Sequence, residues 1–243
     1  MVKMRNIFYF GKLINKNSRV NKKLFFRYYI IANIIPTSRK ELNEYKYKLY
    51  LTQEQKDIIV GCCLGDLYIR NFSGKGCLFF EQKNKEYLFH LYEIFKPFVR
   101  NYPKERKQRR LVTSEYKFTW YFSTLTTDLF FNYRLLFYKN NVKYISDVLS
   151  NSLTPRAIAY WYMDDGNKSS NVCYVLSTCS FTEDEHNILI NIFLEKYEIQ
   201  VVMKYSSGYR YLYISKKLSN NNSHLIFKNL VKPYIVDSML YKL

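Results

Sequence analysis

Two adjacent carboxylates close a short predicted helix in the second half of the chain. Residues 153–169 read Leu-Thr-Pro-Arg-Ala-Ile-Ala-Tyr-Trp-Tyr-Met-Asp-Asp-Gly-Asn-Lys-Ser. Thr154 suits the N-cap, the proline after it suits the first helical position, and Gly166 suits a left-handed C-cap. Asp164 and Asp165 then fall in the last turn, where the helix dipole makes a carboxylate cost about 0.3–1 kcal/mol. An isolated pair of this kind is usually a solvated helix end, so the pattern gains meaning only if it recurs.

A second stretch repeats the pattern earlier in the chain. Residues 51–69 read Leu-Thr-Gln-Glu-Gln-Lys-Asp-Ile-Ile-Val-Gly-Cys-Cys-Leu-Gly-Asp-Leu-Tyr-Ile. They begin with a capping box from Thr52 to Gln55, continue as an apolar run, and end in Asp66. The recurrence of a helix that closes on an acid, in a strongly basic chain, argues against a chance arrangement.

Small residues indicate how these two predicted helices pack. Gly61 and Gly65 are four apart and lie on one helix face, a spacing that lets two helix backbones approach closely. Ala157 and Ala159 offer small residues on the partner helix. If the helices lie side by side, their terminal acids become neighbours. Two carboxylates surrounded by Lys and Arg form a site for hard divalent cations, which prefer oxygen ligands.

The two motifs are Ile-Val-Gly-Cys-Cys-Leu-Gly-Asp-Leu at 59–67 and Ile-Ala-Tyr-Trp-Tyr-Met-Asp-Asp-Gly at 158–166. They resemble the signature motifs of the LAGLIDADG homing endonucleases, in the monomeric, two-motif, organellar intron-encoded branch. Similar strings stand at 80–87, 176–182, 232–234 and 239–243, so the resemblance covers residues 41–243. Two residues depart from the pattern: Leu67 replaces the usual Gly, and Cys179 stands where Gln is expected.

The resemblance implies an α+β protein with a pseudo-two-fold duplicated LAGLIDADG fold, in which two sheets form a DNA-binding saddle. The order and spacing of the expected elements indicate the duplication independently, because each half reads helix, hairpin, helix, hairpin, helix. We expect a basic N-terminal extension at 1–40, a first half at 41–139, a linker at 140–151 and a second half at 152–243. The extension, with ten Lys or Arg and no acid, fits either an import signal or a basic arm on nucleic acid.

Three expectations inside the first half can be checked directly. Residues 85–99 show helical spacing of apolar residues. Residues 104–110 are predicted to form a basic surface loop that clamps phosphates. Residues 116–123 alternate as a strand with one apolar face and one polar face, the latter suited to base edges and phosphates.

The activity implied by the resemblance is site-specific cleavage of a long asymmetric DNA duplex by metal-dependent phosphodiester hydrolysis, which promotes intron mobility. The implied metal ligands are the carboxylates of Asp66 and Asp165 with the carbonyls of Gly65 and Asp164. They would hold two or three Mg²⁺ ions, for which Mn²⁺ can substitute. The Asp164 side chain is expected to be structural, because Gly65 occupies the matching place in the first motif.

Basic residues complete the implied site. The resemblance also implies two lysines beside the metal ligands, which map to Lys143 and Lys242 and would position water and the leaving phosphate. The expected DNA-binding residues are Lys104, Arg106, Lys107, Arg109, Arg110, Lys117, Lys204, Arg210, Lys216 and Lys217. The formal charge of +18 and the pI of about 9.5 agree with a partner rich in phosphates.

Other functions remain open on the sequence alone. An RNA-binding intron maturase on the same scaffold would need neither acid, so retention of both favours the nuclease. A non-catalytic DNA-binding regulator predicts specific binding without metal dependence. A membrane-spanning segment is not expected, since no apolar run approaches the roughly 20 residues that span a bilayer. A basic membrane-surface protein would need an amphipathic Lys-rich helix, and only residues 1–35 could supply one, with a poor fit.

The implied partners are therefore duplex DNA, with intron RNA as a second candidate, and the protein is expected to be a monomer. Five cysteines without a CxxC pair indicate free thiols in a reducing compartment. The abundance of Tyr, Phe, Lys, Asn and Ile suits an AT-rich coding genome. We therefore expect a mitochondrial or other organellar protein, encoded in the organelle.

Overall fold

The computed structural model describes residues 35–109, 116–170, 172–206, 208–218 and 222–243. Residues 1–34 of the predicted N-terminal extension lie outside this part of the chain, as does Arg110 of the predicted DNA-binding set. No helix in the described ranges is both long enough and apolar enough to cross a membrane.

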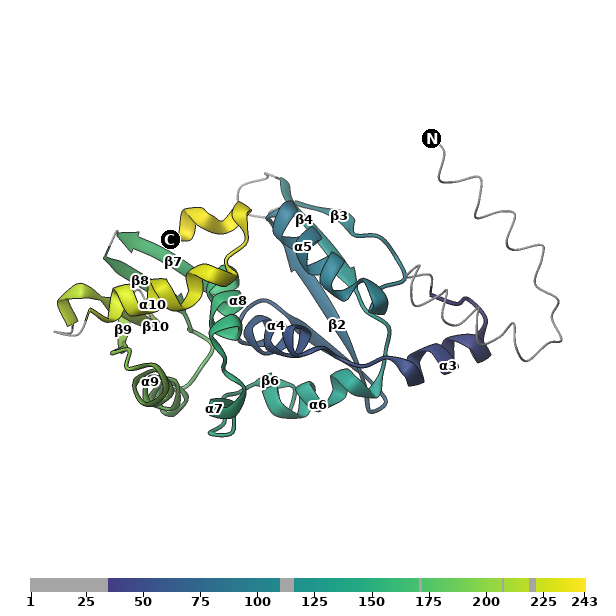
Figure 1. The fold of residues 1–243 in the computed structure, drawn as a ribbon, viewed down its shortest axis with the longest axis horizontal. Helices are drawn as coiled ribbons and strands as arrows, with labels where there is room; N and C mark the ends of the chain where they lie inside the picture. The colour runs from purple at the N-terminus through teal and green to yellow at the C-terminus, as the bar shows by residue number, and fades with distance from the viewer. Residues whose placement is uncertain (1–34, 110–115, 171, 207, 219–221) are drawn as a thin grey trace.

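The two halves contain the same elements in the same order (Figure 1). The first half holds α4 (Gln53–Leu64), β1 (Tyr68–Phe72), β2 (Lys75–Gln82), α5 (Lys85–Phe95), β3 (Lys104–Arg109), β4 (Tyr116–Ser123) and α6 (Asp128–Phe137). The second half holds α8 (Pro155–Asp165), β7 (Gly166–Ser170), β8 (Cys173–Ser177), α9 (Glu183–Tyr197), β9 (Val202–Ser206), β10 (Tyr209–Ser215) and α10 (Ser223–Val231). The predicted duplication of helix, hairpin, helix, hairpin, helix is confirmed.

Short elements precede, join and follow the halves. These are α3 (Arg39–Lys48), β5 (Tyr138–Lys139), β6 (Val142–Lys143), α7 (Leu149–Ser152), and the 3₁₀ turns η1 (Lys96–Phe98), η2 (Lys216–Leu218), η3 (Lys232–Tyr234) and η4 (Asp237–Lys242). The expected linker at 140–151 thus includes strand β6 and most of helix α7. The division of the chain at 41–139, 140–151 and 152–243 stays a prediction.

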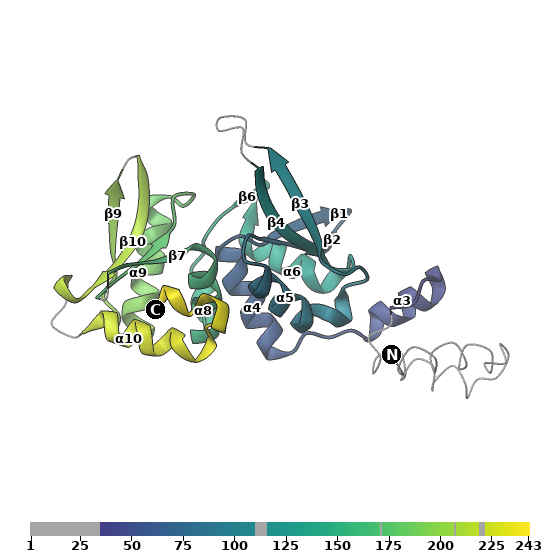
Figure 2. The ribbon, with the colours of Figure 1, turned by 90° about the horizontal axis from the view of Figure 1, so that it is seen from above.

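Each half forms a four-stranded antiparallel sheet with the same topology. The strand orders are β1-β2-β4-β3 and β7-β8-β10-β9. Figure 2 shows the two sheets along one side of the molecule, with the helices of both halves on the other side. The expected saddle of two sheets is therefore present.

One face of the first sheet packs on the helices and the other is open. Leu78 and Phe80 of β2 are buried, so Phe79 and Glu81, which alternate with them, lie on the opposite face. Strand register extends this open face across the sheet. The side chains of the open face include Tyr68, Arg70, Phe79, Glu81, Lys104, Arg106, Gln108, Lys117, Thr119, Tyr121 and Ser123.

The basic segment predicted to be a loop at 104–110 is instead an edge strand. Residues Lys104–Arg109 form β3, which pairs antiparallel with β4 along its whole length. Its six side chains are all polar or charged and mostly exposed, so no apolar alternation marks the strand in the sequence. A charged edge strand also resists unwanted pairing with another chain.

Two other expectations in the first half need adjustment. The helix predicted over 85–99 ends at Phe95 and continues as the turn η1, because Pro97 has no N–H for the next helical hydrogen bond. The strand at 116–123 alternates as expected at Trp120 and Phe122, but Phe118 is exposed and Thr119 is buried.

Helices α4 and α8 pack side by side at the centre of the molecule (Figure 1). A Cβ atom placed on Gly61 would lie 2.2 Å from the carbonyl oxygen of Ala157, so the two backbones are in direct contact there. Nine of the twelve residues of α4 are buried, and seven of the eleven of α8. The predicted close pairing through small residues is confirmed at Gly61.

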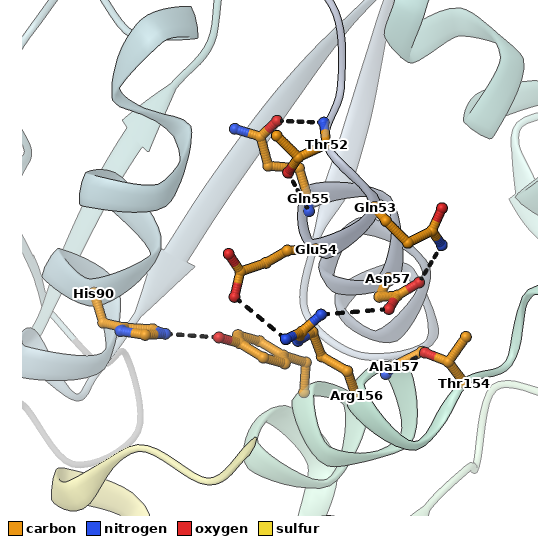
Figure 3. A network of polar contacts seen from close by, with 10 residues as sticks. Thr52, Gln53, Glu54, Gln55, Asp57, His90, Thr154, Arg156 and Ala157 are labelled. Carbon is orange, nitrogen blue, oxygen red and sulfur yellow. Dashed lines mark hydrogen bonds and ion pairs between the residues drawn. The ribbon is translucent and has the colours of Figure 1, made fainter. Parts of the chain in front are cut away.

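The N-terminal ends of the pair are fixed by caps and by cross-helix ion pairs (Figure 3). The capping box of Thr52 with Gln55 starts α4, and the Thr154 hydroxyl accepts from the Ala157 N–H to start α8. The guanidinium of Arg156 lies 3.7 Å from a carboxylate oxygen of Glu54 and 3.7 Å from one of Asp57. These contacts align the starts of both helices, and therefore also their acidic ends.

Substituting Gly61 by Ala tests the helix contact. Ala alone would favour a helix by about 1 kcal/mol relative to Gly. Because its methyl group would overlap the Ala157 carbonyl, we expect a net loss of about 1–3 kcal/mol in the free energy of unfolding, measured by urea denaturation. Asn191→Ala, at an exposed position of α9, is the control and should change stability by less than about 0.5 kcal/mol. A Gly61→Ala protein as stable as the wild type would contradict the backbone contact.

Candidate active site

The two acids predicted from the motifs lie at adjoining helix ends. Asp165 is the last residue of α8, and Asp66 follows the C-cap residue Gly65 of α4. Asp66 is exposed and Asp165 is half-buried. Their charges interact, since Asp66 is one cause of the raised pKa of Asp165. The helix packing therefore brings together the pair that the sequence predicted.

Asp164 acts as a structural link between the halves. Its Oδ1 accepts from the Tyr87 hydroxyl at 2.9 Å and from Gln82 Nε2 at 2.9 Å, and its Oδ2 accepts from the Asp66 backbone N–H at 3.3 Å. Both carboxylate oxygens are thus engaged by the first half. This agrees with the expectation that the Asp164 side chain is structural, and the backbone carbonyl of Asp164 stays the predicted ligand.

Gly65 has no side chain, and this leaves room for the Asp164 carboxylate. A Cβ on Gly65 would lie 2.5 Å from the Asp164 Cβ and 2.8 Å from its Oδ2. The two motifs are therefore complementary at this position, with a missing side chain in one and a carboxylate in the other.

Gln82 was not among the predicted site residues, yet it contacts Asp164 and Asp66. Besides Asp164, its Nε2 donates to Oδ2 of Asp66 at 3.3 Å. In the second half, Cys179 stands just after strand β8, where Gln was expected, and its exposed thiol is a much weaker donor. The unexpected Cys179 in the family pattern was the sequence signal for this inequality between the halves.

The two predicted lysines each reach the C-terminal end of a motif helix. Lys143 Nζ donates to the Gly65 carbonyl at 2.5 Å. Lys242 Nζ donates to the Met163 carbonyl at 2.5 Å and to the Tyr162 carbonyl at 3.4 Å. Lys143 follows Asp66, and Lys242 follows Asp165, at the same separation along the chain, as expected for a duplication.

Lys143 and Lys242 offset two sources of negative charge at the helix ends. Helix C-termini carry partial negative charge, and the acids add to it. Lys242 is buried, which lowers its pKa, while Asp164, Asp165 and Asp66 all act to raise that pKa. Its ammonium group therefore lies within the field of all three carboxylates.

Burial and repulsion make the carboxyls of Asp164 and Asp165 hard to ionise. Desolvation first, and then repulsion from Asp66, raise the pKa of Asp165 to about 7, although Lys143 and Lys242 act to lower it. Burial and then repulsion from Asp66 also raise the pKa of Asp164 well above its usual range, against the opposing effect of the Tyr87 hydrogen bond. An additional positive charge at this position would relieve the repulsion.

The oxygen donors suit a hard divalent cation that shares its coordination with a substrate. In the described ranges, no three His, Cys, Asp or Glu side chains are arranged to hold a metal on their own. Two carboxylates and a helix-end carbonyl leave coordination positions for water and phosphate oxygens, as Mg²⁺ favours. The Gly65 carbonyl already accepts from Lys143, so binding there would use its second lone pair.

A cavity of about 680 Å³ connects this site to the open face of the first sheet. Its lining includes Asp66 and Asp164 of the site, and Arg70, Glu81 and Lys117 of the open face. Arg70, absent from the predicted set, belongs to this surface because its strand follows directly after the first motif.

The predicted DNA-binding residues divide between sheet faces. Lys104, Arg106 and Lys117 lie on the open face of the first sheet. Lys107 and Arg109 alternate with them and lie on the opposite side of β3, with Lys107 Nζ 3.8 Å from the Tyr116 ring centre.

The second half presents fewer charges to a ligand. Lys204 Nζ lies 3.6 Å above the Tyr213 ring, whereas Arg210 points to the helix side of its sheet, 3.9 Å from the Glu183 carboxylate of α9. Lys216 and Lys217 are exposed on the turn η2. Arg210 therefore does not lie on the open sheet face, where a DNA-binding residue was expected.

Fold and site together define a single-chain protein with two pseudo-symmetric halves, paired carboxylates at their junction and a basic sheet surface. The sequence model of the LAGLIDADG DNA endonuclease family matches residues 56–221. The chain is 32% identical to a probable intron-encoded endonuclease 1 of Wickerhamomyces canadensis, over 84% of this chain and 90% of that protein. It is also 32% identical to the cytochrome b mRNA maturase bI2 of Debaryomyces hansenii, over 79% of this chain and 74% of that protein.

A solved structure supports the same assignment. The homing endonuclease I-WcaI bound to its DNA recognition sequence matches with a TM-score of 0.79 and 31% identity, covering 86% of this chain and 93% of that chain. The chain belongs to the LAGLIDADG DNA endonuclease family, in its two-motif, single-chain arrangement. Its function is that of a site-specific DNA endonuclease.

The charge balance of the site predicts a pH-dependent stability in metal-free protein. Because the pKa of Asp165 is higher in the folded state, this carboxyl binds its proton more fully in the folded protein than in the unfolded one between pH 3.8 and about 7. The contribution of Asp165 to the Tm should therefore fall as pH rises through this window in EDTA. Asp165→Asn should reduce the fall, because its neutral amide has no carboxylate to ionise.

Metal addition and a control complete this test. At pH 8, Mg²⁺ or Ca²⁺ should raise the Tm of the wild type and raise that of Asp165→Asn much less. Asp184→Asn, at an exposed position of α9, should keep the wild-type response to pH and metal. Equal responses in Asp165→Asn and the wild type would contradict the predicted role of Asp165.

Proposed function

We propose that this chain cleaves both strands of a long asymmetric DNA target by Mg²⁺-dependent phosphodiester hydrolysis, and that this activity promotes the mobility of the intron that encodes it. The observation that carries the proposal is the convergence of Asp66 and Asp165 at the ends of the packed helix pair, beside a basic sheet surface. Family membership supplies the class of reaction, and the site supports the metal dependence.

Asp66 and Asp165 are proposed to bind the metal ions together with the Gly65 and Asp164 carbonyls. When bound, Mg²⁺ would activate water and neutralise charge that develops on the phosphate. The Asp164 side chain and Gln82 both hold Asp66, the first through its backbone N–H and the second through its carboxylate. Lys143 and Lys242 place ammonium groups at the two helix ends, where they can orient water and oppose charge on the leaving oxygen.

The open faces of the two sheets are proposed to lie along the duplex. Strands fit the major groove, where each base pair shows a distinct pattern of donors and acceptors. Two non-identical halves would read two different half-sites, so the target would lack symmetry. The protein would act as a monomer, because one chain already supplies both acids.

Intron RNA is a second candidate ligand, supported by the identity to a cytochrome b mRNA maturase. The basic surface would serve either nucleic acid, while the two acids have a defined use only in cleavage. Similarity to intron-encoded proteins also supports an origin in an organellar genome, and we propose the mitochondrion as the site of action.

A bind-and-cut selection tests the proposal. Purified protein would bind a long random duplex library in Ca²⁺ and then be transferred to Mg²⁺, with Asp66→Asn and Asp165→Asn in parallel. Wild type should recover one long site with Mg²⁺-dependent central breaks. Each variant should recover the same site with binding within a few-fold of wild type and cleavage reduced by about 100-fold or more, since each loses a charged metal ligand.

The alternative outcomes distinguish the rival functions. Specific recovery without breaks in the wild type would indicate a regulator or a maturase. No enrichment of DNA would point to RNA, and the host intron transcript would then be the next substrate. Cleavage by both Asn variants at the wild-type rate would reject the metal site.

A further inference from the structure

One arginine on the open face of the first sheet is held in place by a carboxylate. Arg106 Nη1 donates to Oε2 of Glu81 at 2.8 Å, across the intervening strand β4. The other oxygen of Glu81 accepts from the Thr119 hydroxyl at 2.6 Å. The carboxylate is therefore fixed by residues of two strands and in turn fixes the guanidinium. Both charged side chains are partly shielded from solvent, with relative exposures of 34% and 24%.

Aromatic rings further restrict the same guanidinium. Arg106 Cζ lies 4.5 Å from the centre of the Tyr121 ring and 5.6 Å from that of Phe79. From the opposite edge of the sheet, Arg70 Cζ lies 4.0 Å from the Phe79 ring. A planar guanidinium held by an ion pair and by ring faces has lost most of its freedom before any ligand arrives.

This arrangement is poor for phosphate binding and good for base recognition. A phosphate contact gains most from an unshielded positive charge, and the Glu81 carboxylate both offsets that charge and repels phosphate. A base contact instead requires donors in a fixed plane, because an arginine reads guanine through two parallel hydrogen bonds to O6 and N7. The ion pair with Glu81 engages Nη1 and sets the plane of the remaining guanidinium donors.

The Arg106–Glu81 ion pair lies on the surface that extends from the candidate active site. Glu81 and Thr119 line the same cavity as Asp66. The residues that hold Arg106 therefore belong to the surface that continues from the active site. DNA seated on the first sheet with its phosphates near Asp66 would pass its major-groove edges over this face.

We infer that Arg106 is a specificity-determining residue that reads a guanine in the major groove of the first half-site, and that Glu81 is its positioning residue. This inference rests on the proposed function. It predicts that G·C is strongly preferred at one base pair of the target, and that this preference depends on both Arg106 and Glu81.

The test compares base preferences at every target position, using the bind-and-cut selection with four proteins. Arg106→Lys keeps the charge but loses the planar fork, and should weaken the guanine preference at one position by about tenfold or more. Glu81→Gln should weaken the preference at that same position. It should also strengthen binding to unrelated DNA and steepen the dependence of log Kd on log salt by about one unit, because one negative charge leaves the binding face.

Lys104→Gln is the matched control, on the same strand and the same open face, two residues from Arg106. It removes a charge without disturbing the Glu81 pair, and it should weaken binding by a similar factor for every sequence. Thermal melts of all four proteins check that each variant is folded.

The outcomes separate this inference from the proposed function. If wild type enriches a site but Arg106→Lys leaves its base profile unchanged, Arg106 is a phosphate contact and the inference is wrong. If Arg106→Lys alters one position and Glu81→Gln does not, the positioning role of Glu81 is wrong. If wild type enriches no DNA site, the proposed function fails and Arg106 has no duplex base to read.

Discussion

The close contact between helices α4 and α8 is the constraint on which the rest of the molecule depends. At Gly61 the contact leaves no room for a Cβ atom. Moving the two helices apart to admit one would open the buried interface between the halves. Arg156 of α8 pairs with Glu54 and Asp57 in the first turns of α4, so the helices start side by side and their C-terminal ends also meet. The junction thus serves as the core of the protein and as the place where the acidic residues converge, and the sheets of both halves extend from it to one side.

Stability and chemistry make opposite demands at these helix ends. Carboxylates are unfavourable at a helix C-terminus, and burial adds to the cost for Asp164 and Asp165. The protein offsets part of this cost with two lysines, an amide and a phenol hydroxyl. The remaining repulsion between Asp66 and Asp165 is what a divalent cation would relieve, so the site is less favourable for the protein alone than for the complex.

The sequence was most informative where local rules operate. N-capping residues, helical periodicity and the small residue Gly61 predicted the motif helices, their pairing and the duplication, whereas Gly166, expected as a left-handed C-cap, has an extended backbone. Strand β3 was missed because its residues are all polar, and its pairing with β4 is a tertiary contact without a local signal. The face on which Arg210 lies depends on strand register, and the contacts of Gln82 with Asp66 and Asp164 depend on the packed helix pair, so neither could be read from spacing. The metal-binding and catalytic roles of the site residues stay predictions.

The fit between Gly65 and Asp164 limits how the two halves can evolve. Their shapes are matched across the junction, and the Asp66 backbone is held by a carboxylate from the other half. A recombinant that joined the first half of one relative to the second half of another would work only if both sides of this contact were compatible. Side chains on the open faces of the sheets are free of that restriction. Under the proposed function, new target sequences would arise by independent change in each sheet, while the residues at the junction would be inherited together.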